Sequence, residues 1–152
     1  MEIAKIAVIG AGNMGHQIAL CAALSGFQVK CTDTNAEILD KAIRFADDYL
    51  QERVSKGKLS QEAADQARIN IAFVPTVAAA AADADLVIEA IIENLAIKRK
   101  LFAALDQLCP AHTILATNSS YIVSSKIADV TTRADKVCNM HFFNPALVMK
   151  LV

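Results

Sequence analysis

The segment IAKIAVIGAGNMG, residues 3–15, decides the fold of this 152-residue chain. Its first seven residues are mostly apolar and rich in β-branched side chains, which is typical of a strand buried on both faces of a parallel sheet. Gly10, Gly12 and Gly15 then form a G-x-G-x-x-G pattern where the strand gives way to a predicted helix. A strand, a glycine-rich turn and a helix in this order predict the start of a doubly wound α/β domain.

The residues that follow complete a βαβ unit. Apolar residues at helical spacing predict a helix over 13–25, and Gly26 is placed to cap its C-terminus. A second strand is expected over 27–32, FQVKCT. Because strand, helix and strand fall within about thirty residues, we expect a βαβ unit with a right-handed crossover.

A helical hairpin is expected at about residues 35–68, inserted between two strands. Thr34 and Glu37 match a capping box, which predicts a long, charged helix from Asn35 onward. Gly57 interrupts that helix, and helical composition resumes a few residues later.

The remainder of the chain alternates between short strands and helices. Strands are expected at 69–74, 85–90, 113–117 and 136–142, and helices at 76–82, 95–108 and 124–130. This alternation predicts a mostly parallel, doubly wound sheet of Rossmann type. The length fits one domain, so we expect residues 1–152 to form a single domain around one core.

Charge and hydropathy exclude several classes of protein. With 15 Lys+Arg against 16 Asp+Glu, no basic stripe is available to neutralise phosphates, so we expect no nucleic-acid partner. The apolar fraction of 55% excludes disorder and indicates a large core or an apolar face for a partner. The longest apolar stretch, residues 71–92, contains Pro75, Asp83, Asp85 and Glu89. We therefore expect no membrane span.

Four cysteines show neither a C-x-x-C motif nor a metal-type spacing: Cys21, Cys31, Cys109 and Cys138. We interpret them as reduced core thiols and expect no metal site, with disulfides as the alternative. The first residues provide no basic region of the kind that opens a signal peptide. Together these features favour a cytoplasmic protein.

The glycine motif predicts a dinucleotide site. Gly10 would permit the tight turn, Gly12 would let the backbone approach the diphosphate, and Gly15 would allow the helix to pack closely on the strand. The diphosphate is expected at the helix N-terminus, beside Asn13 and Met14, where free N–H groups and the helix dipole favour an anion.

Asp33 ends the second predicted strand, eighteen residues after Gly15, where a dinucleotide site needs an acidic residue. Its carboxylate would accept hydrogen bonds from a ribose 2′-hydroxyl and repel a 2′-phosphate, so NAD is favoured over NADP. The alternative is a glycine-rich turn that binds no ligand.

Polar residues follow three other predicted strands, at the sheet edge where ligands bind in open α/β folds. His141 closes one strand, and its position alone is equally compatible with a packing role and a catalytic role. Asn118-Ser119-Ser120 follows another strand and could be an ordinary polar turn. Glu93 follows a third and could simply carry a helix N-terminal charge.

Two further polar features lie within or beside predicted elements. Glu89 lies within an apolar strand and needs a partner or a solvent-facing strand end. His16 and His112 are interpreted as ordinary residues of a helix start and a turn.

These residues together resemble the L-3-hydroxyacyl-CoA dehydrogenase family over essentially the whole chain. Five features carry the resemblance: GAGNMG at 10–15, Asp33, DLVIEAIIENL at 85–95, TNSS at 117–120, and HFFNP at 141–145 followed by VMKLV at 148–152. The last is the most specific, because it is not a general feature of Rossmann domains. A smaller departure is Ser119 and Tyr121, where the family more often has Thr and Ser.

The resemblance implies reversible, NAD-dependent oxidation of the 3-hydroxyl of a 3-hydroxyacyl-CoA to a 3-oxoacyl-CoA. His141 matches the catalytic base, and Ser120 matches the residue that hydrogen-bonds the reacting substrate oxygen. Further positions match residues lining the cofactor: Asp33, Glu93, Lys98, Asn118 and Asn144. Asn144 would also border the substrate, and Lys56 looks like a contact to a phosphate of CoA.

The family pattern continues from VMKLV into a glutamate that orients the histidine, and then into a second, helical domain that covers the acyl chain and makes the dimer. Both lie beyond residue 152, so we expect a cofactor domain that is weakly active or inactive alone. Apolar residues near Val148, Leu151 and Val152 would then be uncovered, which predicts self-association. The alternatives are a non-catalytic, crystallin-like NAD-binding module and a dehydrogenase of small hydroxy acids.

Overall fold

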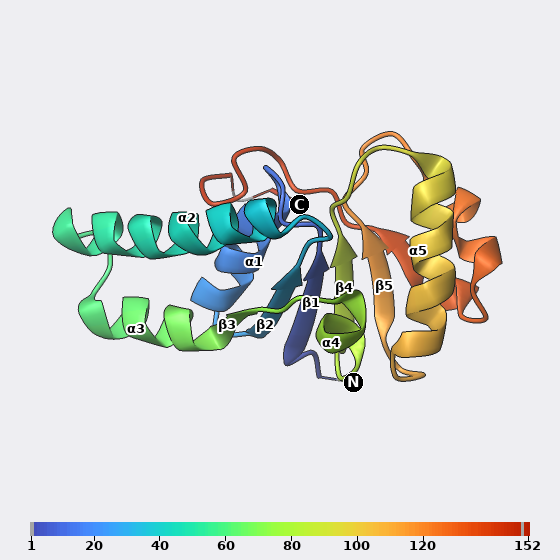
Figure 1. Cartoon of the computed structure of the whole chain (residues 1–152), viewed down its shortest axis with the longest axis horizontal. Coiled ribbons are helices and arrows are strands. Elements are labelled where there is room, and N and C mark those ends of the chain that lie inside the picture. The colour runs from blue at the N-terminus through green and yellow to red at the C-terminus, as the bar shows by residue number, and fades with distance from the viewer. Residues whose placement is uncertain (1, 150) are drawn as a thin grey trace.

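The sheet has six parallel strands in the order β3-β2-β1-β4-β5-β6 (Figure 1). The structure, a computed structural model, describes residues 2–149 and 151–152. The strands are β1 Lys5–Ile9, β2 Gln28–Thr32, β3 Ile71–Phe73, β4 Leu86–Glu89, β5 Ile114–Thr117 and β6 Val137–Asn139. This is the strand order of a doubly wound sheet, and it confirms the fold class predicted from the sequence.

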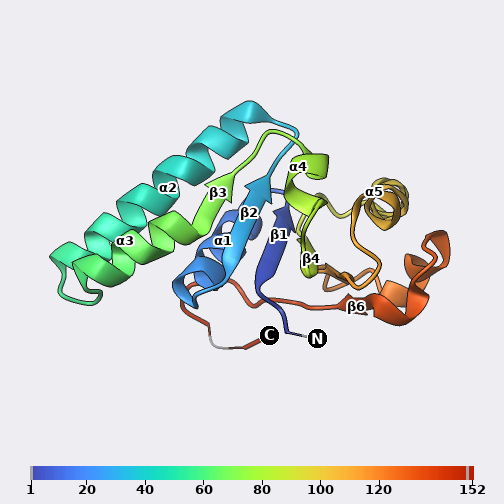
Figure 2. The ribbon, with the colours of Figure 1, turned by 90° about the horizontal axis from the view of Figure 1, so that it is seen from below.

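Helices cover both faces of the sheet. They are α1 Gly15–Leu24, α2 Ala36–Ser55, α3 Gln61–Asn70, α4 Val77–Ala81 and α5 Leu95–Leu108. Figure 2 shows α1 on one face and α4 and α5 on the other, while the antiparallel pair α2–α3 extends outward past β3. The structure thus contains the expected helical hairpin. Among the described residues, no helix is long and apolar enough to cross a membrane.

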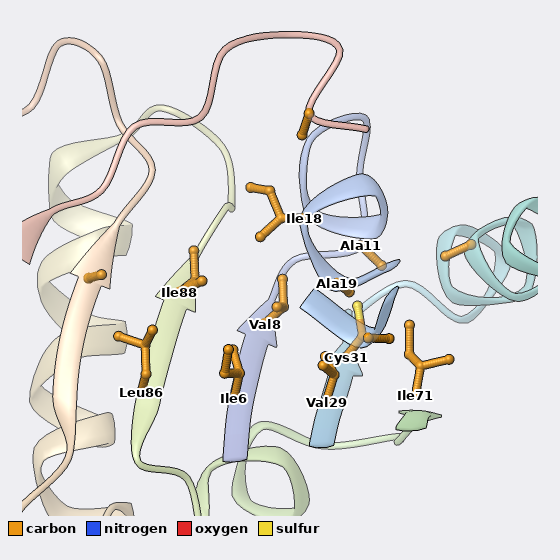
Figure 3. Close-up of a cluster of buried hydrophobic side chains, with 14 residues drawn as sticks. Ile6, Val8, Ala11, Ile18, Ala19, Val29, Cys31, Ile71, Leu86 and Ile88 are labelled. Carbon is orange, nitrogen blue, oxygen red and sulfur yellow. The ribbon is translucent and has the colours of Figure 1, made fainter. Parts of the chain in front are cut away.

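The core lies on both sides of β1, as expected for a strand buried on both faces. Ile6 and Val8 point toward α1 and pack with Ile18 (Figure 3), whereas Ala7 and Ile9 pack on the opposite face with α4 and α5. A third cluster joins α1 to the hairpin through Leu20, Ala46, Leu50, Ala64 and Ala67. The hairpin is therefore packed against the domain rather than suspended from it.

The capping box predicted at Thr34 and Glu37 is wrong. Asn35 is the N-cap of α2, and its side-chain oxygen accepts a hydrogen bond from the Glu37 amide at 2.9 Å. The reason is that Asp33 Oδ1 accepts the Asn35 amide at 2.9 Å. This contact turns the chain one residue later than the capping box requires, so α2 begins at Ala36.

Two elements near the C-terminus are shorter than predicted. The helix expected over 124–130 is a pair of 3₁₀ turns, Ser124–Lys126 and Ala128–Val130. The strand expected over 136–142 ends at Asn139. From there the contacts are made by side chains: the Asn139 side chain donates to carbonyl groups of the neighbouring loop, and the Asn118 side chain accepts the Phe142 amide. His141 consequently lies two residues after the strand instead of closing it.

Asp85 anchors the start of β4 to the N-terminal segment. Its Oδ2 accepts the amides of Ala4 at 2.9 Å and Lys5 at 2.8 Å, and its Oδ1 lies 2.9 Å from Nε2 of His112. These hydrogen bonds lower the pKa of Asp85 from 3.8 to about 2. His112 is therefore a partner of Asp85 and not merely a turn residue.

A pH-dependent contribution to stability follows from this lowered pKa. Because the folded state favours the Asp85 carboxylate, the contribution is present above the unfolded value of 3.8 and is lost as the pH falls toward about 2. We expect wild type to be more stable than Asp85→Asn at pH 7, and the difference to close between about pH 4 and pH 2. Urea unfolding at several pH values measures this, with Asp40→Asn on the exposed face of α2 as control. A difference that is constant with pH would contradict the prediction.

Candidate functional site

The glycine-rich loop joins β1 to α1 with very little space. Gly10 has a φ of +99°, and a Cβ there would lie 2.6 Å from the carbonyl oxygen of Ala90. A Cβ on Gly15 would lie only 1.7 Å from the carbonyl oxygen of Gly10. At Gly12, in contrast, a Cβ would meet nothing within 4 Å. Two of the glycines are thus demanded by packing, and the third leaves open space in front of the loop.

The loop also presents unpaired amides at the start of α1. Within the described part of the chain, the backbone N–H groups of Gly12, Asn13 and Met14 have no acceptor. The first turn of α1 has no side-chain cap and no acidic residue. Free N–H groups at a helix N-terminus, without a competing carboxylate, suit a bound phosphate. The residues present therefore fit the diphosphate of a dinucleotide.

Asp33 connects the end of β2 to this loop. Its Oδ2 accepts the Ala11 amide at 2.8 Å, while its Oδ1 holds the Asn35 amide. Each carboxylate oxygen keeps a second lone pair, so Asp33 can still accept hydrogen bonds from a ribose hydroxyl.

His16 has a role that its sequence position did not reveal. Its Nδ1 lies 2.6 Å from the carbonyl oxygen of Gly12, and its ring packs edge-on against Phe45 with centroids 4.4 Å apart. The imidazole therefore fixes the orientation of the Gly12 peptide beside the free amides.

His141 lies at the same edge of the sheet, beyond β6, and its ring is oriented by Asn118, the residue that follows β5. Its Nδ1 lies 2.8 Å from the carbonyl oxygen of Asn118. Because a carbonyl can only accept, Nδ1 carries the proton in the neutral ring and Nε2 carries the lone pair. The Asn118 side chain also accepts the Phe142 amide at 2.8 Å. One residue therefore sets both the tautomer of His141 and the path of the chain around it.

A buried ionic network lies directly behind this edge. Glu89, at the end of β4, is 0% exposed, and its Oε1 lies 2.5 Å from Nζ of Lys98, which is 1% exposed. Its Oε2 accepts the hydroxyl of Thr117 at 2.7 Å. Lys98 Nζ also lies 3.3 Å from Glu93, which in turn accepts the hydroxyl of Ser119.

Glu93 is the member of this network that reaches solvent. Partial burial would raise the pKa of its carboxyl, but the hydrogen bond from Ser119 and the charge of Lys98 outweigh burial and leave the pKa below its usual value. Glu93 is therefore an anion at neutral pH, with a side chain that is exposed after the carboxyl end of β4.

The predicted site residues are not all alike in position. Most of them follow the carboxyl ends of five strands, β1, β2, β4, β5 and β6. These are the glycine loop, Asp33, Glu93, Asn118, Ser120, His141 and Asn144. Ser120 and Asn144 are exposed. Lys98 is enclosed behind the surface, so a direct contact with cofactor stays a prediction and its visible contacts are Glu89 and Glu93.

Lys56 is separated from the other predicted residues. It is the C-cap of α2, at the outer end of the hairpin (Figure 1), where it pairs with Glu52. Within the described residues, no group of three or more His, Cys, Asp or Glu side chains could hold a metal ion.

The fold and the loop define a Rossmann dinucleotide-binding domain. The family model "3-hydroxyacyl-CoA dehydrogenase, NAD binding domain" matches residues 5–152. The chain therefore belongs to the 3-hydroxyacyl-CoA dehydrogenase family and forms its NAD-binding domain. This confirms the resemblance stated from the sequence motifs.

Similar proteins agree with this assignment. The chain is 44% identical to the "Probable 3-hydroxybutyryl-CoA dehydrogenase" of Bacillus subtilis, covering 100% of the chain and 53% of that protein. It is also 44% identical to the 3-hydroxyadipyl-CoA dehydrogenase of Escherichia coli, covering 100% of the chain and 32% of that protein. A crystal structure of 3-hydroxybutyryl-CoA dehydrogenase from Escherichia coli K12 superimposes with a TM-score of 0.94 at 43% identity, covering 99% of this chain and 32% of that one. The chain thus spans about half or less of the length of these relatives.

Proposed function

We propose that this protein takes part in the NAD-dependent oxidation of the 3-hydroxyl of a 3-hydroxyacyl-CoA to the 3-oxoacyl-CoA, and in the reverse reduction. The observation that carries the proposal is the fixed tautomer of His141: a histidine with Nδ1 bonded to a carbonyl has Nε2 free to accept a proton. The names of the relatives, which are dehydrogenases of 3-hydroxyacyl-CoA compounds, support the substrate class.

In this proposal the chain binds, orients and exchanges a proton. The amides of the glycine loop hold the diphosphate of NAD, and Asp33 holds the adenosine ribose. Bound NAD would supply the hydride acceptor. His141 Nε2 takes the proton of the substrate hydroxyl, and in the reverse direction returns it to the 3-oxo oxygen. Ser120, exposed beside His141's anchor Asn118, donates a hydrogen bond to that same substrate oxygen.

The remaining predicted residues border the reactants. Asn118, Glu93 and Asn144 line the cofactor, and Asn144 also borders the substrate. Lys56 would contact a phosphate of CoA, which requires the nucleotide part of CoA to lie along the hairpin, because Lys56 lies at its outer end.

Substituting His141 separates binding from chemistry. We expect His141→Asn to reduce acetoacetyl-CoA-dependent oxidation of NADH by ~100-fold or more, while NADH affinity changes less than about threefold. The wild-type chain is expected to turn over slowly at most. Equal, measurable turnover in the two proteins would contradict the role of His141. Tight NADH binding without turnover in wild type is the result expected of a cofactor domain that is inactive alone.

We also propose that the chain self-associates through an apolar surface near its C-terminus. Four side chains there are exposed by 43–69%: Val148, Met149, Leu151 and Val152. Large exposed apolar patches usually mark interfaces. Light scattering should give a mass above the monomer at high concentration, and Val148→Asp should lower it. A monomeric mass at every concentration would contradict this.

A cytoplasmic location stays a prediction, supported by the state of the cysteines. All four are free thiols, and burial raises the pKa of Cys31 to about 12 and that of Cys109 to about 11. Buried free thiols of this kind are typical of proteins in a reducing compartment.

A further inference from the structure

We propose that Glu89 is a positioning residue, whose buried carboxylate holds Thr117 and Lys98 so that the loop of residues 118–122 presents the site residues correctly to cofactor and His141. This inference rests on the proposed function, because the loop carries Asn118 and Ser120. It assigns a role to a residue that touches neither reactant.

The contacts of Glu89 leave it no part in the chemistry itself. Oε1 accepts hydrogen bonds from Lys98 Nζ at 2.5 Å and from the Ile91 amide at 2.8 Å, and Oε2 accepts from Thr117 at 2.7 Å. Both oxygens are thus engaged with the protein, and the side chain is 0% exposed. A carboxylate enclosed in this way can position its neighbours but cannot reach a substrate.

A first route runs from Glu89 through β5 to the loop. The hydroxyl of Thr117, which donates to Glu89, also accepts the Ser119 amide at 3.2 Å. The backbone carbonyl of Glu89 accepts the Asn118 amide at 2.8 Å. The first two amides of the loop are therefore held by Glu89 or by its partner Thr117, and they flank the Asn118 carbonyl that fixes the His141 ring.

A second route runs through Lys98 and returns to the same loop. Lys98 lies between Glu89 and Glu93, and Glu93 accepts the hydroxyl of Ser119. The oxygen of that hydroxyl accepts the amides of Tyr121 at 3.2 Å and Ile122 at 2.7 Å. Four of the five residues of the loop are thus linked to the Glu89–Lys98 pair, either directly or through Thr117, Ser119 and Glu93, and Ser120 lies between the linked residues.

The energetics favour a geometric role for the pair over a purely stabilising one. Removing two charges from water costs several kcal/mol per ion, and apolar residues of similar volume often give equal or greater stability. What a buried carboxylate contributes is a fixed geometry, because each of its hydrogen bonds requires a donor at a defined position. The chain offers a comparison in the Asp106–Arg133 pair, with side chains 2% and 10% exposed, which lies near the C-terminal end of α5, away from the glycine loop and His141.

The test uses Thr117, where a hydroxyl can be removed without changing shape. Thr117→Val loses the hydrogen bond to Glu89, and Thr117→Ser retains it. Two quantities are measured for each variant and for wild type: NADH affinity by fluorescence, and the ¹⁵N chemical shifts of the His141 ring in the free protein, which report its tautomer. We expect Thr117→Val to weaken NADH binding roughly tenfold and to give a mixture of tautomers. Thr117→Ser should restore both.

Asp106→Asn and Glu89→Gln form a second, matched pair of isosteric substitutions in buried ion pairs. Both should lower the unfolding midpoint in urea, but only Glu89→Gln should alter NADH affinity and the His141 shifts. The inference is overturned if Thr117→Val behaves as wild type in both measurements, or if Asp106→Asn weakens NADH binding as much as Glu89→Gln. Failure of the proposed function looks different: wild type would then bind no NADH, while the His141 shifts would still report on the loop.

Discussion

Replacing Gly12 by alanine is expected to weaken NADH binding by about tenfold or more without lowering stability. A Cβ at this position meets no protein atom within 4 Å, so the folded chain accommodates it. That same Cβ would enter open space at the loop, and we expect it to obstruct the diphosphate, which must approach the backbone at this glycine. Calorimetric titration with NADH and urea unfolding measure the two effects.

Gly15→Ala is the matched control, because here the added Cβ collides with the protein itself and not with the space open to a ligand. Its Cβ would lie 1.7 Å from the Gly10 carbonyl oxygen, so α1 must move away from β1. We expect a loss of stability of about 3 kcal/mol or more, together with loss of NADH binding. Wild-type affinity in Gly12→Ala, or wild-type stability in Gly15→Ala, would contradict the structure of the loop.

Lys98→Met is expected to destabilise the fold by about 3–5 kcal/mol, measured by urea unfolding at pH 7. The methionine fits the volume of the lysine stem, but it leaves the Glu89 carboxylate buried without its cation. Breaking a buried pair in this way costs far more than breaking an exposed one.

Lys56→Met provides the control for Lys98→Met. The Lys56–Glu52 pair joins side chains that are 57% and 56% exposed, so its loss should not measurably change the unfolding midpoint. If Lys98→Met were as stable as Lys56→Met, the Glu89–Lys98 pair would not be enclosed as the structure shows.

Local patterns were sufficient to predict the parts of the fold that depend on local sequence. The strand, glycine loop and helix at residues 3–25 follow from periodicity and from the places where only glycine fits. The bounds of α5, Leu95–Leu108, match those expected, because Asn94 caps one end and Pro110 follows the other. The boundary of α2 was missed, since it depends on the Asp33 contact to Asn35.

The candidate site depends more heavily on contacts between distant segments. Motifs indicated His141, but its tautomer is set by the Asn118 carbonyl, twenty-three residues away. The sequence indicated that Glu89 needs a partner, but the enclosure of Lys98 and the link to Thr117 appear only when α5 is packed against β4 and β5. No sequence pattern indicated the role of His16, because its contact with Phe45 joins α1 to the hairpin.

Calorimetric titration of this chain with NADH, with NADPH in parallel, tests the central claim most directly. The account predicts saturable binding of one NADH in the micromolar range, and weaker binding of NADPH, whose 2′-phosphate would face the Asp33 carboxylate. Absence of NADH binding in a folded chain would contradict the assignment of the glycine loop, and with it the functional proposals built on that loop.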